Sequence, residues 1–242
     1  MTYGLGMLLR EGLVMAADTR TNAGVDHIAT MRKLTLFQQP GTAMMCVASA
    51  GNLATTQSVV TRLNQRLGVL GNIHNLFEAP TMFEAATIVG NVLREVMAAD
   101  ASHVSAYGDA SASLLLGGQI QGEGQRLFLI YSAGNFIEAS EDTPFLQIGE
   151  LKYGKPILDR TVTYEMHLGE AQKVLLISFD ATIRSNLSVA LPIDVFAKKA
   201  DDLNMGEIHR VNQDDVYFNT IRKSYSEGLK DVVSALPIVD WS

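Results

Sequence analysis

The order of strand-like and helix-like segments is the feature that most limits how this chain can fold. Alternating or continuous short apolar runs predict strands, and apolar residues at helical spacing predict helices. In chain order we expect strands over Tyr3–Leu9, Leu13–Ala17, Leu34–Phe37 and Ala43–Ala48, helices over Asn52–Leu67 and Met82–Ala99, strands over Ala112–Gly117, Arg126–Tyr131, Phe136–Ala139 and Phe145–Ile148, helices over Leu151–Leu158 and Leu168–Thr182, strands over Val189–Phe196 and Gly206–Arg210, and a last helix over Asp214–Leu229.

These separate runs of strands and helices exclude a parallel sheet made of βαβ units, because strands and helices would then alternate. They favour stacked antiparallel sheets with helices on the outer faces. The predicted class is therefore α+β, with the shape of a four-layer αββα sandwich. Periodicity alone leaves another α+β arrangement open.

Two local patterns predict how particular elements begin or turn. The first two strands are separated by a short turn, and we expect Gly12 to adopt the left-handed conformation there. Thr81 precedes the second expected helix, and Glu84 follows three residues later, the spacing of a capping box.

The chain is expected to form a single domain over residues 1–242. It contains no low-complexity tract and no stretch rich in Pro, Ser and Gly that would act as a linker. Hydrophobic residues make up 47% of the chain and charged residues make up 19%. This composition supplies enough apolar material for one large core.

The charge pattern excludes several classes of partner. The net charge is −7 and the basic residues are scattered, whereas nucleic-acid binding needs clustered Lys and Arg. No apolar run reaches the roughly 20 residues that a membrane helix needs, and no secretory signal is visible. Cys46 is the single cysteine, so no internal disulfide can form. We expect a cytoplasmic protein that contacts neither nucleic acid nor membrane.

Thr2 directly follows the initiator methionine, and a small second residue favours removal of Met1. A threonine at the mature N-terminus has its own base, because the free α-amine has a reference pKa of about 7.7–8.0. That amine can accept the hydroxyl proton directly or through a water. Thr is also a common second residue with no chemical role, so Thr2 alone is weak evidence.

The segment around Thr2 resembles the start of proteasome β-type subunits, which are N-terminal-nucleophile (Ntn) hydrolases. The likeness rests on Thr2–Arg20, which ends in Ala-Ala-Asp-Thr-Arg, on Met31–Leu34 with its basic pair, and on Ser49–Asn52. It covers roughly the first quarter of the chain, and the order of elements agrees along the whole chain. It implies the four-layer Ntn-hydrolase fold and a threonine-type endopeptidase that needs no cofactor and no metal.

The same resemblance implies roles for particular residues. Thr2 would be the nucleophile, Lys33 the active-site lysine and Asp18 its partner. The oxyanion donor would be a backbone N–H of Ala48 or Ser49, and Arg20 and Thr21 would border the substrate cleft. Elementary chemistry agrees: a lysine near the nucleophile lowers the hydroxyl pKa, and a buried ammonium needs a carboxylate partner. A structural ion pair is the plain alternative for Asp18 and Lys33, and for Arg20 it is at least as favoured as substrate contact.

The second half of the site departs from the family pattern. The family has an Asp-x-x-Ser pair after its fourth helix, where Ser188 fits the serine and Ser185 stands in place of the acid. Asp180 lies five residues earlier, which is the wrong helical spacing to replace it. Glu150 or Lys152 occupies the neighbourhood of the family's other serine. These changes leave the amine with less support and put the catalytic rate in doubt.

Four further motifs resemble the Anbu, or ancestral β-subunit, branch of bacterial proteasome homologues. They are Thr-Tyr-x-x-Gly-Met at the start, Thr-Asn-Ala-Gly-Val-Asp at 21–26, Gly-Glu-x-Lys-Tyr-Gly-Lys-Pro at 149–156 and Arg-Ser-Asn-Leu-Ser-Val at 184–189. This likeness implies homo-oligomers in rings or lock-washer spirals, with peptide or protein as substrate and no assigned unfoldase.

Other chemistries find little support. The five histidines lack zinc-site spacing, no G-x-S-x-G elbow is present, and the glycines near residue 120 do not form a nucleotide-binding loop. Three hypotheses remain: a threonine peptidase inside an oligomer, an Ntn amidase acting on small or γ-linked amides, and a catalytically weak scaffold of the same fold.

Overall fold

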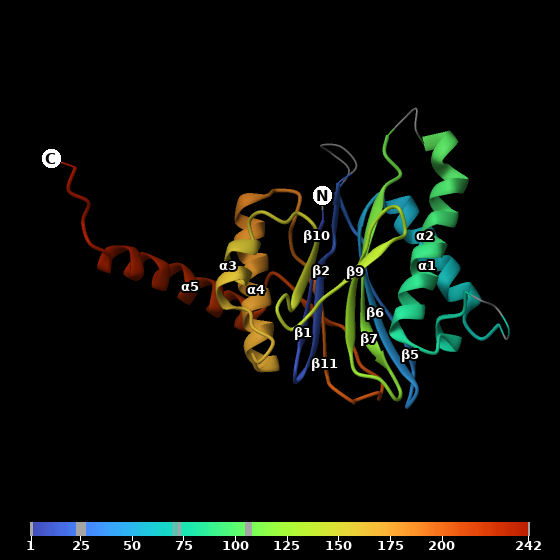
Figure 1. Cartoon of the computed structure of the whole chain (residues 1–242). Helices are drawn as coiled ribbons and strands as arrows, with labels where there is room; N and C mark the ends of the chain where they lie inside the picture. The colour runs from blue at the N-terminus through green and yellow to red at the C-terminus, as the bar shows by residue number, and fades with distance from the viewer. Residues whose placement is uncertain (1, 23–27, 70, 72–73, 105–107, 242) are drawn as a thin grey trace.

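Two five-stranded antiparallel sheets form the centre of the molecule in a computed structural model that describes residues 2–22, 28–69, 71, 74–104 and 108–241 (Figure 1). In spatial order the first sheet consists of β10 (Phe145–Gly149), β1 (Tyr3–Leu9), β2 (Gly12–Asp18), β11 (Ile193–Lys199) and β12 (His209–Val211). The second consists of β5 (Leu34–Gln39), β6 (Ala43–Gly51), β7 (Ala112–Ile120), β8 (Arg126–Ile130) and β9 (Phe136–Glu138). A short pair, β3 (Arg20–Asn22) and β4 (Ile28–Thr30), continues from the end of β2.

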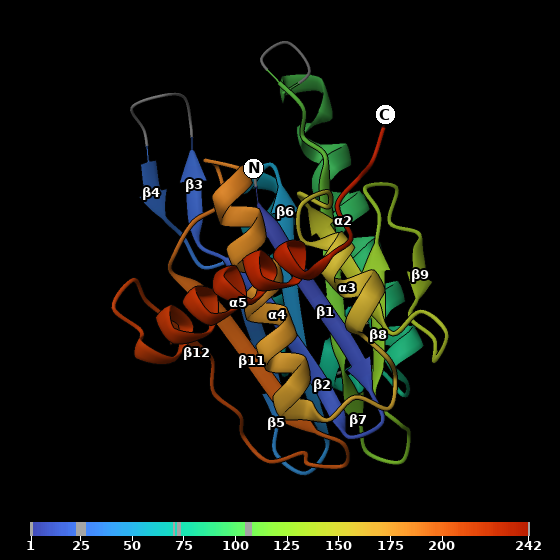
Figure 2. The ribbon, with the colours of Figure 1, turned by 90° about the vertical axis from the view of Figure 1, so that its left-hand side faces the viewer.

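Helices cover both sheets. They are α1 (Leu53–Arg66), α2 (Met82–Val104), α3 (Lys155–Thr161), α4 (Leu168–Ser185) and α5 (Val216–Ala235), with a short 3₁₀ turn η1 at Leu76–Glu78. Helices α1 and α2 pack beside the second sheet, while α3 and α4 lie on the first, as Figures 1 and 2 show. The predicted α+β class with antiparallel sheets is confirmed. No helix within the described ranges is long and apolar enough to cross a membrane.

Strands β1 and β2 are buried along their whole length because both faces of their sheet are covered. One face packs on α3 and α4 through residues such as Leu5 and Phe179. The other packs on the second sheet, where Met15 lies in one apolar cluster with Cys46 and Leu115. This double cover explains why the sequence of these strands is continuously apolar rather than alternating.

Side-chain caps set the starts of two helices. The Asn52 side chain accepts hydrogen bonds from the backbone N–H groups of Ala54 and Thr55, so α1 begins at Leu53. The Glu84 backbone N–H donates to Thr81 Oγ1 at 3.2 Å, which confirms the predicted cap of α2.

The structure corrects the expected conformation of Gly12. This residue is the first of β2 and does not adopt a left-handed conformation. A glycine is needed at position 12 because β11 passes close by. A Cβ added there would lie 2.3 Å from the carbonyl oxygen of Lys198.

Several boundaries also differ from the expectation. Among the described residues, six strands precede α1 instead of four, because the three-residue β3 and β4 are too short to show periodicity. The third helix begins at Lys155 rather than Leu151, with Pro156 in its first turn, where the missing N–H does no harm. Strands β11 and β12 each begin a few residues later than expected. The last helix continues to Ala235 rather than ending at Leu229.

Candidate active site

Thr2 lies at the start of β1, where it is 8% exposed. The Glu150 backbone N–H donates to the Thr2 carbonyl oxygen at 2.7 Å and ties it to the end of β10. Gly149 makes this approach possible, since its φ is +79° and an added Cβ would lie 2.0 Å from the same oxygen. The backbone of Thr2 is therefore held in place while its side chain faces a cavity.

Asp18 and Lys33 form a buried ion pair next to Thr2. Lys33 Nζ donates to Asp18 Oδ1 at 3.0 Å and to the carbonyl oxygen of Arg20 at 2.5 Å. The backbone N–H groups of Tyr3 and Arg20 donate to the two carboxylate oxygens of Asp18, at 2.9 and 3.2 Å. The side chains of Lys33 and Asp18 are 5% and 0% exposed. These contacts place the ion pair beside the first residue of β1.

Burial changes the protonation of both groups. It lowers the pKa of Lys33 below its ordinary value, and the Asp18 carboxylate only partly offsets this effect. Burial also raises the pKa of Asp18, against the opposing influence of Lys33 and the Tyr3 N–H. Burial thus disfavours the charged forms of both groups, while their contact with each other favours them.

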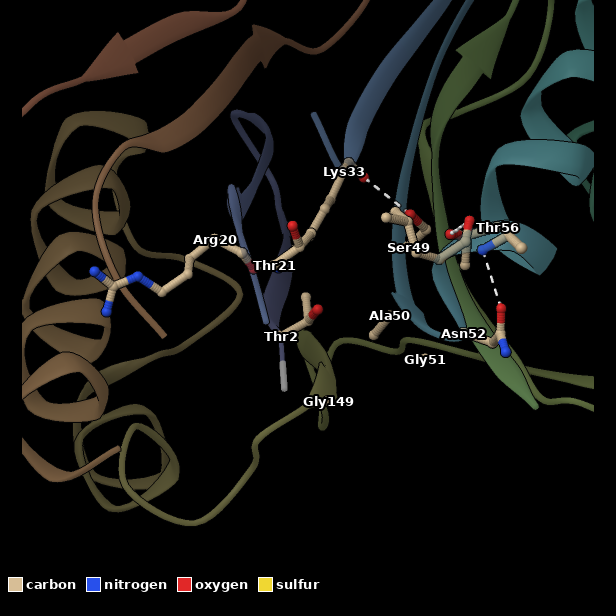
Figure 3. A pocket seen from close by; sticks show the side chains of 12 residues that line it. Thr2, Arg20, Thr21, Lys33, Ser49, Ala50, Gly51, Asn52, Thr56 and Gly149 are labelled. Atoms are coloured by element: carbon tan, nitrogen blue, oxygen red, sulfur yellow. Dashed lines mark hydrogen bonds between the residues drawn. The ribbon is translucent and has the colours of Figure 1, made fainter. Parts of the chain in front are cut away.

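A cavity of about 570 Å³ opens in front of these residues. Figure 3 shows Thr2, Thr21, Lys33 and Ser49 around it, with Gly51 and Asn52 on the side of α1. The lining residues come from both sheets and from the start of α1, so the cavity exists only in the folded chain. Many of the residues that line it have small side chains, such as Ser49, Ala50 and Gly51.

Neither backbone N–H that was expected to contact the oxyanion, that of Ala48 or that of Ser49, is placed for this role. Ala48 is fully buried within β6 and does not line the cavity. Ser49 lines the cavity, but its backbone N–H already donates to the Lys33 carbonyl oxygen at 2.9 Å. Alternate residues of a strand direct their N–H groups to the same edge. The next N–H on this edge belongs to Gly51, which lies beyond the first residue of β5 and was not predicted from the sequence.

Arg20 and Thr21 continue from the end of β2 into β3. Arg20 lines the cavity, although its guanidinium points away from Thr2 (Figure 3) and donates to the carbonyl oxygen of Leu187 at 3.0 Å. Thr21 lines the cavity, and its hydroxyl donates to the carbonyl oxygen of Ala29. Residues 23–26 of the Thr-Asn-Ala-Gly-Val-Asp motif, and Met1, lie outside the described residues.

The loop after α4 holds the remaining expected residues. Ser188 is half-buried, with its backbone N–H bonded to Asn186 Oδ1 at 2.9 Å, and it does not line the cavity. Ser185 is exposed at the end of α4. The buried Asp180 carboxylate accepts from Arg184 and Arg222, both at 2.9 Å, and so is committed to α4 and α5.

Glu150 is the carboxylate that follows the Thr2 contact directly. It is 8% exposed, and its two oxygens accept from the Lys152 backbone N–H and from Asn186 Nδ2. The contact between Glu150 and Asn186 joins the β10–α3 loop to the α4–β11 loop. The sequence indicates Glu150 only as a neighbour of the site, because its partner Asn186 is distant in the chain.

Comparison with known proteins identifies the family. A scan of protein-family models and a search of curated proteins gave no match. Among solved structures, the ancestral β-subunit Anbu of Yersinia bercovieri is 50% identical over 99% of both chains, with a TM-score of 0.93. The Anbu Gly-1 mutant of Hyphomicrobium sp. strain MC1 is 47% identical over 99% of this chain and 100% of that one, with a TM-score of 0.91.

The chain belongs to the Anbu family. This membership confirms the resemblance seen in the sequence. A third Anbu structure, from Pseudomonas aeruginosa, is 48% identical over 99% of this chain and 98% of that chain, with a TM-score of 0.94. It is described as a helical assembly of the Anbu complex. In the described part of this Anbu chain, no group of three or more His, Cys, Asp or Glu is placed to hold a metal ion.

Proposed function

We propose that this protein is a self-assembling, proteasome-like threonine hydrolase that cleaves peptide bonds. Thr2 would be the N-terminal nucleophile after removal of Met1, on a four-layer Ntn-hydrolase fold. The observation that supports this most is the buried Asp18–Lys33 pair beside the first strand residue, at the mouth of a cavity that Thr2 lines. A buried lysine is costly, and a purely structural role would be served as well by apolar residues.

The proposed reaction uses only groups of this chain and water. The Thr2 hydroxyl oxygen attacks the carbonyl carbon of the substrate, and the hydroxyl proton passes to the neutral α-amine. The ammonium so formed protonates the leaving amide nitrogen as the C–N bond breaks, which leaves an ester on Thr2. Water then hydrolyses the ester with the amine again as base. The positive charge of Lys33 lowers the pKa of the hydroxyl and disfavours early protonation of the amine.

We assign the oxyanion contact to the backbone N–H of Gly51. This group lies on the same edge of β6 as the engaged N–H of Ser49, and Gly51 lines the cavity. A donor aimed at the developing negative charge is worth about 10²–10³ in rate.

Gly51→Ala is expected to lower kcat by about 10²–10³. Gly51 has a φ of +111°, and an added Cβ would lie 2.4 Å from the Ser111 carbonyl oxygen, so the N–H must move. Gly41→Ala is the matched control, because its φ is +74° but nothing lies within 4 Å of the added Cβ. Both changes strain the backbone, so both lower the melting temperature, and only the first should lower kcat. Equal rates for the two variants would contradict the assignment.

The proposal is tested by treating purified full-length protein with a peptide epoxyketone and locating the adduct by peptide mass. This reagent reacts with both the hydroxyl and the free α-amine of an N-terminal threonine. We expect a chain mass without Met1 and an adduct on Thr2. A chain that retains Met1 would refute the mechanism.

One observation favours a second candidate, a catalytically weak scaffold. Ser185 is exposed, Asp180 is bound by two arginines, and both Glu150 oxygens already accept hydrogen bonds. Position 185 therefore supplies no carboxylate to the α-amine, and the carboxylates of Asp180 and Glu150 are already engaged elsewhere. A processed chain that forms no adduct would favour the scaffold, or an amidase whose cavity excludes peptides.

Assembly and location complete the proposal. By analogy with the Pseudomonas structure, we propose a homo-oligomer of rings or lock-washer spirals. A cytoplasmic location agrees with the single buried Cys46, which makes no disulfide. No unfoldase partner is proposed.

A further inference from the structure

The peptide unit that joins Thr2 to Tyr3 is hydrogen-bonded on both of its sides. Its N–H, which belongs to Tyr3, donates to Asp18 Oδ1 at 2.9 Å. Its carbonyl oxygen, which belongs to Thr2, accepts from the Glu150 backbone N–H at 2.7 Å. A peptide unit is planar, so these two contacts fix the orientation of the bond that leaves the Thr2 Cα. The direction in which the Thr2 hydroxyl and α-amine point therefore depends on both partners.

The sheet supports these two partners very differently. Asp18 ends β2, which lies between β1 and β11 in the first sheet. Glu150 follows β10, which in the described part of the chain is an edge strand and pairs with β1 alone. The end of an edge strand opens more easily than a central strand unless other contacts hold it. The Glu150 N–H therefore needs support from outside the sheet.

A side-chain bridge between Glu150 and Asn186 supplies that support. Glu150 Oε2 accepts from Asn186 Nδ2 at 2.8 Å, and Glu150 Oε1 accepts from the Lys152 backbone N–H at 3.1 Å. Asn186 caps the end of α4, where its backbone N–H donates to the Thr182 carbonyl oxygen at 2.9 Å. Its Oδ1 accepts from the Ser188 backbone N–H at 2.9 Å. The bridge thus ties the end of β10 to a helix that packs in the core.

The chemistry of the bridge indicates a role beyond packing. Glu150 is 8% exposed, and burying a carboxylate costs free energy even when it is hydrogen-bonded. An apolar side chain would cover the same surface at less cost, but it would make no directional contact. A hydrogen bond instead sets both a distance and an angle between the two loops. The bridge therefore defines the position of the residue whose N–H holds Thr2.

We propose that Glu150 and Asn186 are positioning residues that hold the Thr2–Tyr3 peptide in the orientation that the reaction needs. This inference rests on the proposed function, in which the Thr2 hydroxyl attacks the substrate and the α-amine accepts its proton. Neither Glu150 nor Asn186 lines the cavity, so loss of the bridge should slow the reaction without weakening substrate binding. A misplacement of about 1 Å can cost about 10² in rate.

The test exchanges the two ends of the bridge. Glu150→Gln alone leaves one acceptor oxygen where the bridge uses two, and Asn186→Asp alone sets two carboxylates against each other. In the double variant the new amide at position 150 can donate to the new carboxylate at position 186. The contacts with the backbone N–H groups of Lys152 and Ser188 are also kept. Each single variant should therefore break the bridge, and the double variant should rebuild it with opposite polarity.

The measurement is the labelling of purified full-length protein by a peptide epoxyketone, followed over time at several reagent concentrations. Each single variant should show a maximal labelling rate that is lower by about 10², with an unchanged reagent concentration at half-maximal rate. The double variant should recover most of the wild-type rate. A merely structural contact would instead change the fraction of folded protein and leave the labelling rate of that fraction unchanged.

Gln119→Glu is the matched control. Gln119 is also a buried amide that contacts a carboxylate, since its Nε2 donates to Asp201 Oδ1 at 2.7 Å. It pairs with Met44 near the start of β6, whereas Gly51 at the other end of that strand lines the cavity. The variant sets two carboxylates against each other, so it should lower the melting temperature as Asn186→Asp does. Its folded fraction should be labelled at the wild-type rate.

Hydrogen exchange at the backbone amide of position 150 tests the bridge without any reaction. This amide donates to the Thr2 carbonyl oxygen, so it should be protected in the wild type and in the double variant. It should exchange about tenfold faster or more in both single variants. If the wild type is not labelled, the proposed function fails, and this exchange still decides whether the bridge holds Thr2.

Wild-type labelling rates in both single variants would overturn the inference, and so would unchanged exchange at position 150. A double variant that regains the wild-type melting temperature but is labelled slowly would also overturn it, because the carboxylate of Glu150 itself would then be needed. Slow labelling of Gln119→Glu would assign the loss to general destabilisation and overturn the inference as well.

Discussion

Replacing Thr2 by alanine is expected to abolish hydrolysis, with a loss of about 10⁴-fold or more in kcat. The change removes the hydroxyl oxygen that forms the covalent intermediate, and no other hydroxyl among the described cavity residues lies at the start of β1 to replace it. The backbone contact with Glu150 uses the Thr2 carbonyl oxygen and remains. Fold and assembly should therefore be unaffected.

The measurement is peptide and amide hydrolysis together with epoxyketone labelling. Thr21→Ala is the matched control, because Thr21 lines the same cavity and loses the same hydroxyl. It should retain most activity, since its hydroxyl bonds the Ala29 carbonyl oxygen rather than the reacting atoms. Hydrolysis by the Thr2→Ala variant at the wild-type rate would remove Thr2 from the mechanism.

Replacing Lys33 by alanine should have two large effects, one on rate and one on stability. The rate should fall by orders of magnitude, because the positive charge that lowers the pKa of the Thr2 hydroxyl is lost. The Asp18 carboxylate, which is fully buried, loses its partner. The free energy of unfolding should therefore fall by about 3–5 kcal/mol. The first effect is measured by kcat and the second by denaturant unfolding.

Lys198→Ala separates the two effects. Lys198 is also a buried lysine, and it pairs with Asp202, whose side chain is 38% exposed and can be solvated when the lysine is removed. We expect a smaller loss of stability and an unchanged rate for this variant. A rate loss under about tenfold for Lys33→Ala, roughly 1.4 kcal/mol, would reduce Lys33 to a structural role.

The order and kind of the main elements could be predicted from the sequence because they depend on local periodicity. Strands β1, β2, β6 and β7 and helices α1, α2 and α4 are long enough to show it. The short strands β3 and β4 were missed, because their pairing is stabilised by neighbours rather than by their own pattern. The conformation of Gly12 was predicted wrongly, because the reason for a glycine there is the close approach of Lys198, which is distant in the chain.

The candidate site shows the same division. Thr2, Asp18 and Lys33 were predicted from residue type and motif, and the contact between Asp18 and the start of β1 follows from the hairpin that joins β1 to β2. The proposed donor on Gly51 was not predicted from the sequence, because only the structure shows that the Ser49 N–H is already bonded to Lys33. The direction of Arg20 was left open by the sequence, and its contact with the distant Leu187 decides it.

The sequence by itself determined which chemical groups this protein has and in what order its strands and helices form. Periodicity, capping residues and the N-terminal threonine motif are local properties, and they persist whatever the chain packs against. Tertiary structure alone decided that the Ser49 N–H bonds to the Lys33 carbonyl oxygen, how burial shifts the pKa values of Asp18 and Lys33, and where α5 leaves the core. Those properties depend on desolvation and on partners distant in the chain, because a hydrogen bond or a buried charge is defined only by what surrounds it.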